Sequence, residues 1–168
     1  TGRIAPVGPA LTESPNDRRE AGGVLVVPAL VNAHPHVALP LLRGHADGNP
    51  LGAWLREDVW PVGAELRGGD VYAGARLGLV EMIRSGTTAI ADMYFQMDEV
   101  CEAVAETGVR ARLGRGAVTV DAAGEAAREE VAETVRVAER LDGRADGRVT
   151  GAVCPHSLTT VGEERLVQ

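Results

Sequence analysis

Short apolar runs and longer segments with helical spacing alternate along this chain. The clearest apolar run is residues 29–34, whose β-branched centre is typical of a fully buried parallel strand. Residues 70–84 repeat apolar side chains at a four-residue step, which predicts an amphipathic helix. Asp70 is expected to cap the start of this helix, and Gly86 is expected to end it.

The remainder of the chain continues this alternation. Further strands are predicted at residues 87–93, 110–118 and 149–154, and further helices at 51–57, 98–107, 124–141 and from near Gly162. Strands that alternate with helices predict a parallel sheet with right-handed crossovers. The predicted fold class is therefore α/β, a partial TIM-type barrel of roughly the first four βα units. Ahead of it, residues 1–8 and 24–27 are predicted as short strands joined by a polar loop.

Composition narrows the classes of partner and chemistry. A net charge of −7 argues against nucleic acid and anionic membrane surfaces, because both require a basic patch. All 17 basic residues are arginine, which excludes Schiff-base lysine chemistry in this segment. Two cysteines are too few for a disulfide scaffold and indicate a reducing compartment, so we expect a cytoplasmic protein. No apolar run approaches the roughly 20 residues that span a bilayer.

Two histidines directly follow the first predicted barrel strand. His34 and His36 are separated by one residue, and residues i and i+2 of a strand point to the same side. Both imidazoles can therefore converge beyond the strand end, where barrel enzymes present metal ligands. The alternative is a pair of solvated loop histidines, because a bare His-x-His also arises by chance among four histidines.

Several short blocks of this sequence, each present once, follow an order that is known from a protein family. They are residues 28–36, 41–44, 54–55, 60–61, 81–88, 91–95 and 155–157. In order and rough spacing they resemble the metal-dependent amidohydrolase superfamily, and within it the methylthioadenosine/S-adenosylhomocysteine deaminase and chlorohydrolase branch. The resemblance covers nearly the whole chain. The blocks are specific for the branch together, whereas no single block is.

The resemblance implies a hydrolase that uses metal-activated water to deaminate, or dechlorinate, an aminated heteroaromatic ring such as a purine, nucleoside or triazine. It implies that His34 and His36 ligate one divalent metal, zinc in preference to iron, and that His156 and Arg115 contact the substrate. Arg128 fits a second substrate contact only if one residue is deleted, and a solvated guanidinium is its alternative. A hydrogen bond within the loop is the alternative for His156. Branch members are commonly oligomeric, so a homo-oligomer is expected at full length.

The family's other functional residues have no counterpart in this segment. Its third histidine ligand, late aspartate and catalytic glutamate would be supplied elsewhere, so we assign no catalytic residue here and expect the isolated chain to be inactive. A complete barrel needs about 250 residues, and we interpret the 168 residues as a fragment. Residues 1–27 would be part of an accessory β-sandwich domain and 28–168 the N-terminal half of the barrel. A non-catalytic half-barrel that binds or assembles with a partner is one alternative, and a metal-free relative is another.

Three positions refine this interpretation. Nucleoside deaminases of the branch carry a ribose-binding glutamate where this chain has Gly63, and often a tyrosine where it has Thr159. Loss of an acceptor for the ribose hydroxyls would change specificity, so the reaction class is kept and the substrate stays open. Asp92, which follows the second barrel strand, is interpreted as structural, because carboxylates at strand ends often hold neighbouring backbone N–H groups.

Overall fold

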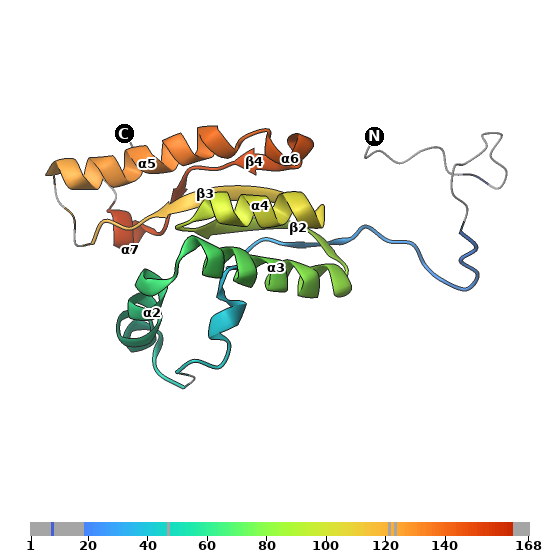
Figure 1. Cartoon of the computed structure of the whole chain (residues 1–168), viewed down its shortest axis with the longest axis horizontal. Helices are drawn as coiled ribbons and strands as arrows, with labels where there is room; N and C mark the ends of the chain where they lie inside the picture. The colour runs from blue at the N-terminus through green and yellow to red at the C-terminus, as the bar shows by residue number, and fades with distance from the viewer. Residues whose placement is uncertain (1–7, 9–18, 47, 121, 123, 163–168) are drawn as a thin grey trace.

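The computed structural model describes residues 8, 19–46, 48–120, 122 and 124–162 (Figure 1). Its centre is a parallel sheet with the strand order β1-β2-β3-β4, in which the short β5 also pairs with β3. The strands are β1 (Leu30–Asn32), β2 (Thr87–Tyr94), β3 (Arg110–Ala117), β4 (Val149–Gly151) and β5 (Cys154–Pro155). One row of paired residues crosses the four main strands, from Asn32 through Ile90 and Ala111 to Val149.

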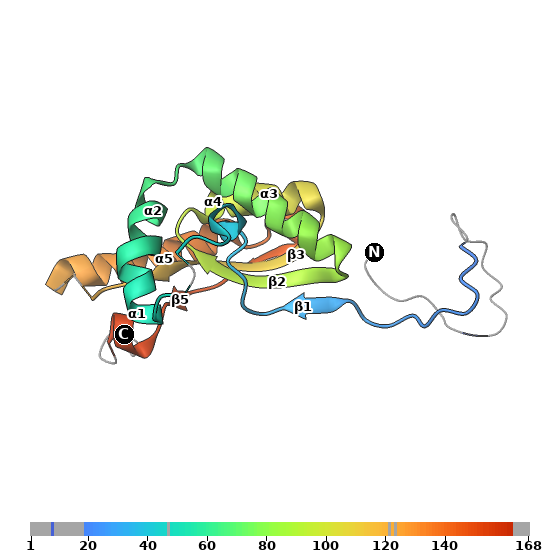
Figure 2. The same ribbon diagram turned by 90° about the horizontal axis from the view of Figure 1, so that it is seen from below.

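Three long helices pack on one face of this sheet (Figures 1 and 2). They are α3 (Gly68–Arg84), α4 (Met97–Thr107) and α5 (Gly124–Leu141). Their apolar stripes meet the side chains of β2 and β3 in one core, where Leu79, Val100 and Leu113 are fully buried. Sequential parallel strands with all long helices on one face are typical of a (β/α) barrel, whereas a doubly wound sheet has helices on both faces. The predicted partial barrel of about four βα units is confirmed.

The other face of the sheet carries no helix among the described residues (Figure 2). Alternate residues of β3 divide between the two faces, so that Leu113 enters the core while Arg112 is exposed. In a barrel the face opposite the helices points inward. The exposed face is therefore the inner side of the barrel wall.

Shorter helices occupy the loops. They are the 3₁₀ helix η1 (Leu39–Leu42), α1 (Leu51–Ala53), the π-helix η2 (Trp54–Val59), α2 (Trp60–Glu65), α6 (Arg144–Gly147) and α7 (Leu158–Val161). The helix predicted at 51–57 is therefore longer and less regular, and it continues to Glu65. Among the described residues, no helix is long and apolar enough to cross a membrane.

The start of α3 differs from the prediction. The helix begins at Gly68, so Asp70 lies in its first turn instead of at the N-cap. There the Asp70 Oδ2 atom accepts a hydrogen bond from the Arg67 backbone N–H at 2.9 Å, which is the reciprocal half of a capping box. Gly86 follows the helix with φ of 88°, a backbone conformation that glycine adopts without strain, as predicted.

Two further predictions are wrong in detail. The strand predicted at 149–154 is interrupted after Gly151 and divides into β4 and β5. The helix predicted from near Gly162 lies, beyond that glycine, outside the described residues; the last described helix, α7, ends just before it, with Gly162 as its C-cap. Residues 24–27 form no strand in the structure, and Leu25 is 85% exposed. The strand predicted at 1–8 lies outside the described residues except for residue 8, and the division at residue 27 stays a prediction.

Candidate metal and substrate site

The two predicted metal ligands lie together just beyond the end of β1. The His34 and His36 rings are 5.6 Å apart between centroids and meet edge to face. Both residues are exposed, whereas Pro35 between them is buried and holds the turn against the protein. The His34 backbone N–H donates to Asn32 Oδ1 at 3.1 Å, which fixes the exit from the strand. The sequence predicted this juxtaposition of two imidazoles, and the structure has it.

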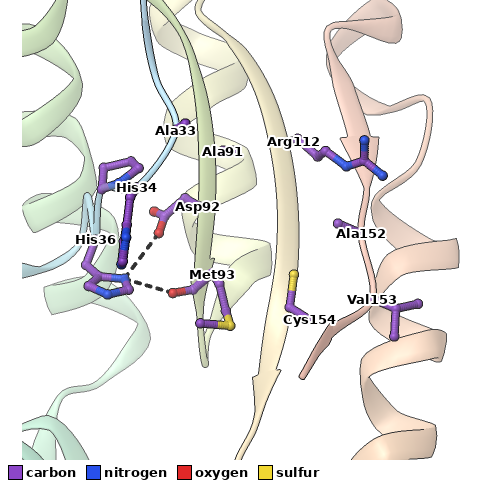
Figure 3. Close-up of a pocket in the computed structure, with 11 residues that line it drawn as sticks. Ala33, His34, His36, Ala91, Asp92, Met93, Arg112, Ala152, Val153 and Cys154 are labelled. Carbon is purple, nitrogen blue, oxygen red and sulfur yellow. Dashed lines mark hydrogen bonds and ion pairs between the residues drawn. The ribbon is translucent and has the colours of Figure 1, made fainter. Parts of the chain in front are cut away.

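His36 is also held by the neighbouring strand. Its Nδ1 atom lies 3.0 Å from the Met93 carbonyl oxygen and 3.6 Å from Asp92 Oδ1 (Figure 3). The Asp92 carboxylate raises the pKa of His36 above its ordinary value, and the Met93 carbonyl adds to the rise, while partial burial opposes it. Since a carbonyl oxygen only accepts, Nδ1 must carry the hydrogen, and in the neutral ring Nε2 is left with its lone pair.

Asp92 is a buried carboxylate at the carboxyl end of β2, with 3% of its surface exposed. Its Oδ2 atom accepts a hydrogen bond from the Val37 backbone N–H at 3.1 Å. The interpretation of Asp92 as a residue that holds a neighbouring backbone N–H is therefore confirmed. Its Oδ1 atom is buried without a hydrogen-bond partner among the described residues.

A pocket of about 400 Å³ lies beside the two histidines on the inner side of the sheet (Figure 3). Its lining is His34, His36, Asp92, Ala33, Pro35, Ala91, Met93, Arg112, Ala152, Val153 and Cys154. A mostly apolar lining with a few polar groups is typical of a site for a small molecule. The volume and composition therefore suit a small molecule beside the histidine pair.

Arg112 and Cys154 also line this pocket, and neither was predicted as a site residue from the sequence. The alternation of side chains along β3 could have indicated the position of Arg112. Arg112 points to the same face as Gly114 and to the face opposite Leu113, which is buried in the core. Burial raises the pKa of the Cys154 thiol above its ordinary value, and the nearby Arg112 opposes this only in part. A raised pKa favours the protonated thiol, which is a poorer nucleophile than the thiolate.

The three predicted substrate contacts lie away from this pocket. Arg115 donates to Glu130 at 2.7 Å on the helix-covered side of β3, and its guanidinium lies 6.0 Å from the Phe95 ring centroid. Arg128 is exposed on α5, 3.7 Å from Glu125. The His156 Nδ1 atom lies 2.9 Å from Thr160 Oγ1 in the turn before α7. A substrate role for His156, Arg115 and Arg128 stays a prediction.

The donor set fits part of a metal site. Two neutral imidazoles side by side suit zinc, which prefers nitrogen and sulfur ligands in a tetrahedral arrangement. Within the part of the chain that the structure describes, no cluster of three or more histidine, cysteine, aspartate or glutamate side chains could hold a metal ion. His34 and His36 would therefore supply two ligands, and the remaining ligands would have to come from other residues.

The fold and the histidine pair define a (β/α)-barrel protein with two adjacent histidines at the carboxyl end of its first described strand. The chain belongs to the amidohydrolase family, whose sequence profile matches residues 25–168. The resemblance found in the sequence blocks is thereby confirmed at the level of the family.

Similar proteins agree with this assignment. A 5-methylthioadenosine/S-adenosylhomocysteine deaminase of Halobacterium salinarum is 56% identical over 165 residues, which are 98% of this chain and 38% of that protein. An adenosine deaminase from Xanthomonas campestris, crystallised with bound zinc, is 34% identical with a TM-score of 0.68 over 82% of this chain and 31% of its own. The atrazine chlorohydrolase TrzN of Arthrobacter aurescens TC1, complexed with zinc, is 20% identical with a TM-score of 0.68 over 82% of this chain and 36% of its own, a likeness of fold. The chain thus spans well under half of the length of these relatives.

Proposed function

We propose that this chain is the metal-binding part of a hydrolase that removes the amino group from the purine ring of an adenosine derivative. The observation that carries the proposal is the placement of His34 and His36 together beside a pocket at the carboxyl end of β1. The 56% identity to a methylthioadenosine/S-adenosylhomocysteine deaminase supports the reaction class and points to 5′-thio-substituted adenosines as first substrates. The dechlorination of a triazine is the second outcome that a substrate screen should test.

The histidine pair, the apolar lining and Arg112 have different roles in this proposal. His34 and His36 would hold one divalent metal, which supplies a polarised water for hydrolysis when it is bound. The lining of small apolar residues would accept the flat face of the ring and exclude bulk water. Arg112 is exposed in the pocket and would offer hydrogen bonds to acceptor atoms of the ring or its substituents.

The finer features follow from the relatives and the sequence. Zinc is proposed over iron because two related structures hold zinc, and two imidazoles suit either metal. A homo-oligomer is proposed because members of the branch that this chain resembles are commonly oligomeric. A cytoplasmic location is proposed because the two cysteines are free. Substrate contacts by His156, Arg115 and Arg128 are part of the proposal, although Arg115 would have to exchange its bond to Glu130 for one to substrate.

Gly63 bears on the nucleoside. A Cβ atom at this position of α2 would lie 3.3 Å from the Tyr94 hydroxyl, and glycine itself offers no acceptor for the ribose hydroxyls. We therefore expect weak discrimination at the ribose hydroxyls and tolerance of substituents on the sugar. A comparison of adenosine with its 2′-deoxy form measures this directly.

The test is carried out on the protein produced from its native gene. Zinc content, ammonia release from 5′-methylthioadenosine and S-adenosylhomocysteine, and chloride release from a chlorotriazine are measured together. We expect about one zinc per chain, deamination of at least one adenosine, and loss of both in the double variant His34→Ala/His36→Ala. His45→Asn is the matched control, because His45 is an exposed histidine outside the pocket lining. Metal binding and activity that survive in the double variant would contradict the proposal.

A further inference from the structure

The two oxygen atoms of the buried Asp92 carboxylate have different surroundings. One oxygen, Oδ2, accepts from the Val37 N–H at 3.1 Å. The other oxygen, Oδ1, is fully buried and has no hydrogen-bond partner among the described residues, yet it lies 3.6 Å from His36 Nδ1. A buried carboxylate oxygen without a donor is costly to a fold, so its persistence calls for a role beyond the Val37 contact.

The position of Oδ1 indicates that role. His36 Nδ1 donates to the Met93 carbonyl at 3.0 Å, and Asp92 Oδ1 lies on the same edge of the ring (Figure 3). Two acceptors on neighbouring residues of β2 thus face one nitrogen. They hold the hydrogen on Nδ1 and leave the opposite nitrogen, Nε2, as the free donor of a lone pair.

The backbone beyond His36 is clamped between the same carboxylate and α3. Val37 and Ala38 are buried, and Gly74 and Gly78 of α3 lie directly against them. A Cβ atom on Gly74 would lie 2.1 Å from the Ala38 carbonyl oxygen, which shows how closely the helix approaches this turn. The Asp92 side chain therefore fixes the backbone after His36 through one oxygen and faces the ring of His36 with the other.

We propose that Asp92 is a positioning residue that orients His36 so that Nε2 is the metal-binding nitrogen. The inference rests on the proposed function, because it assigns a purpose to the orientation of a metal ligand. A carboxylate behind a ligating imidazole fixes its tautomer and ring orientation, and removal of such a group weakens metal binding by roughly 10- to 100-fold.

The variant that tests this is Asp92→Asn in the full protein. Asparagine keeps an oxygen for the Val37 N–H and removes the anion that faces His36. We expect zinc affinity, measured by competition with a chelator, to fall by roughly 10- to 100-fold. The unfolding temperature of the metal-free protein should change little by comparison. Asp142→Asn is the matched control, because the Asp142 carboxylate also accepts from a backbone N–H, that of Gly151 at 3.0 Å, and does not line the pocket.

A second measurement reports on the ring itself. In metal-free wild-type protein labelled with ¹⁵N-histidine, the NMR spectrum should show His36 protonated at Nδ1, and Asp92→Asn should show a mixture of tautomers. An Nε2-protonated His36 in the wild type overturns the inference even if the variant does not fold. Zinc affinity that is unchanged in a folded Asp92→Asn overturns it as well. A wild-type protein that binds no zinc and deaminates no adenosine overturns the proposed function first, so the two failures are distinct.

Discussion

Gly74 occupies the closest contact between α3 and the turn that carries the histidine pair. Its missing side chain leaves room for the Ala38 carbonyl oxygen, which a Cβ atom would approach to 2.1 Å. Backbone on both sides prevents relief by a simple rotamer change. We expect Gly74→Ala to lower the free energy of unfolding by about 1–3 kcal/mol, as overpacked interiors do, and to displace the turn after His36. Urea unfolding measures the first effect, and zinc affinity the second.

Gly69→Ala is the control for this substitution. Gly69 lies in the same helix, and a Cβ atom there would have no atom within 4 Å. Alanine should stabilise that turn of helix by about 0.5–1 kcal/mol, because glycine loses more backbone entropy on folding. If Gly74→Ala proved as harmless as Gly69→Ala, the close approach of α3 to the turn would not constrain the site.

At the same scale, the sequence predicts some side chains well and others poorly. His34 and His36 were predicted to converge because the two-residue period of a strand fixes their common direction. The direction of Arg115 was not predictable in this way. It lies inside the strand predicted at 110–118 and inside β3, and within a strand a shift of one residue changes the face. Its pairing with Glu130 depends on how α5 packs, which no local pattern encodes.

Among the elements, α4 and α5 are joined by charged side chains at their exposed edges. Arg140 donates to both carboxylate oxygens of Asp98, at 2.7 Å and 3.2 Å. These hydrogen bonds hold the pKa of Asp98 below its ordinary value, with partial burial opposing them. A lowered pKa means that the unfolded chain binds the proton more readily. The pair therefore stabilises the fold above the ordinary pKa of the carboxyl, and this contribution disappears as the pH falls through the lowered one.

Because both side chains are about half exposed, solvent screens the pair and its worth is at most about 1 kcal/mol. We expect a double-mutant cycle of Asp98→Asn and Arg140→Gln to give a coupling free energy of about 0.5–1 kcal/mol at pH 7. The coupling should vanish in acid and shrink in high salt. Glu125→Gln serves as the reference, since Glu125 is 89% exposed and lies 3.7 Å from its partner. Coupling that is unchanged in acid would contradict the assignment.

The elements themselves followed the hydrophobic pattern closely where that pattern was strong. The helices at 68–84, 97–107 and 124–141 and the strands at 87–94 and 110–117 agree with their predicted ranges to within about two residues. The segment at 51–65 was harder, because its π-helix η2 does not follow the 3.6-residue period by which α-helices are predicted. The predicted fourth strand divides beside Gly114 of β3, where a Cβ atom would lie 2.2 Å from the Ala152 carbonyl oxygen. Such a long-range backbone approach is not visible in local sequence.

For the molecule as a whole, the inner side of the sheet determines how the 168 residues behave in solution. Val31 on β1 is 68% exposed, and Leu25 in the preceding extended segment is 85% exposed. Strand β1 also lies at an edge of the sheet, where its outer backbone groups face no other strand among the described residues. An exposed edge beside an apolar surface favours association between chains.

We therefore expect the 168-residue chain on its own to self-associate at micromolar concentration, measured by sedimentation velocity, and to bind a hydrophobic dye. The double variant Leu25→Glu/Val31→Glu should shift the distribution toward the monomer, because it places charge on the apolar segment and on the edge strand. Leu77→Glu changes a 43% exposed leucine on α3, on the helix-covered side of the sheet, and should leave association unchanged. A wild-type chain that sediments as a monomer would mean that the described half of a barrel protects its own inner surface. We would then have to abandon the proposal that further barrel units cover this surface. The same units are expected to supply the metal ligands that His34 and His36 leave missing.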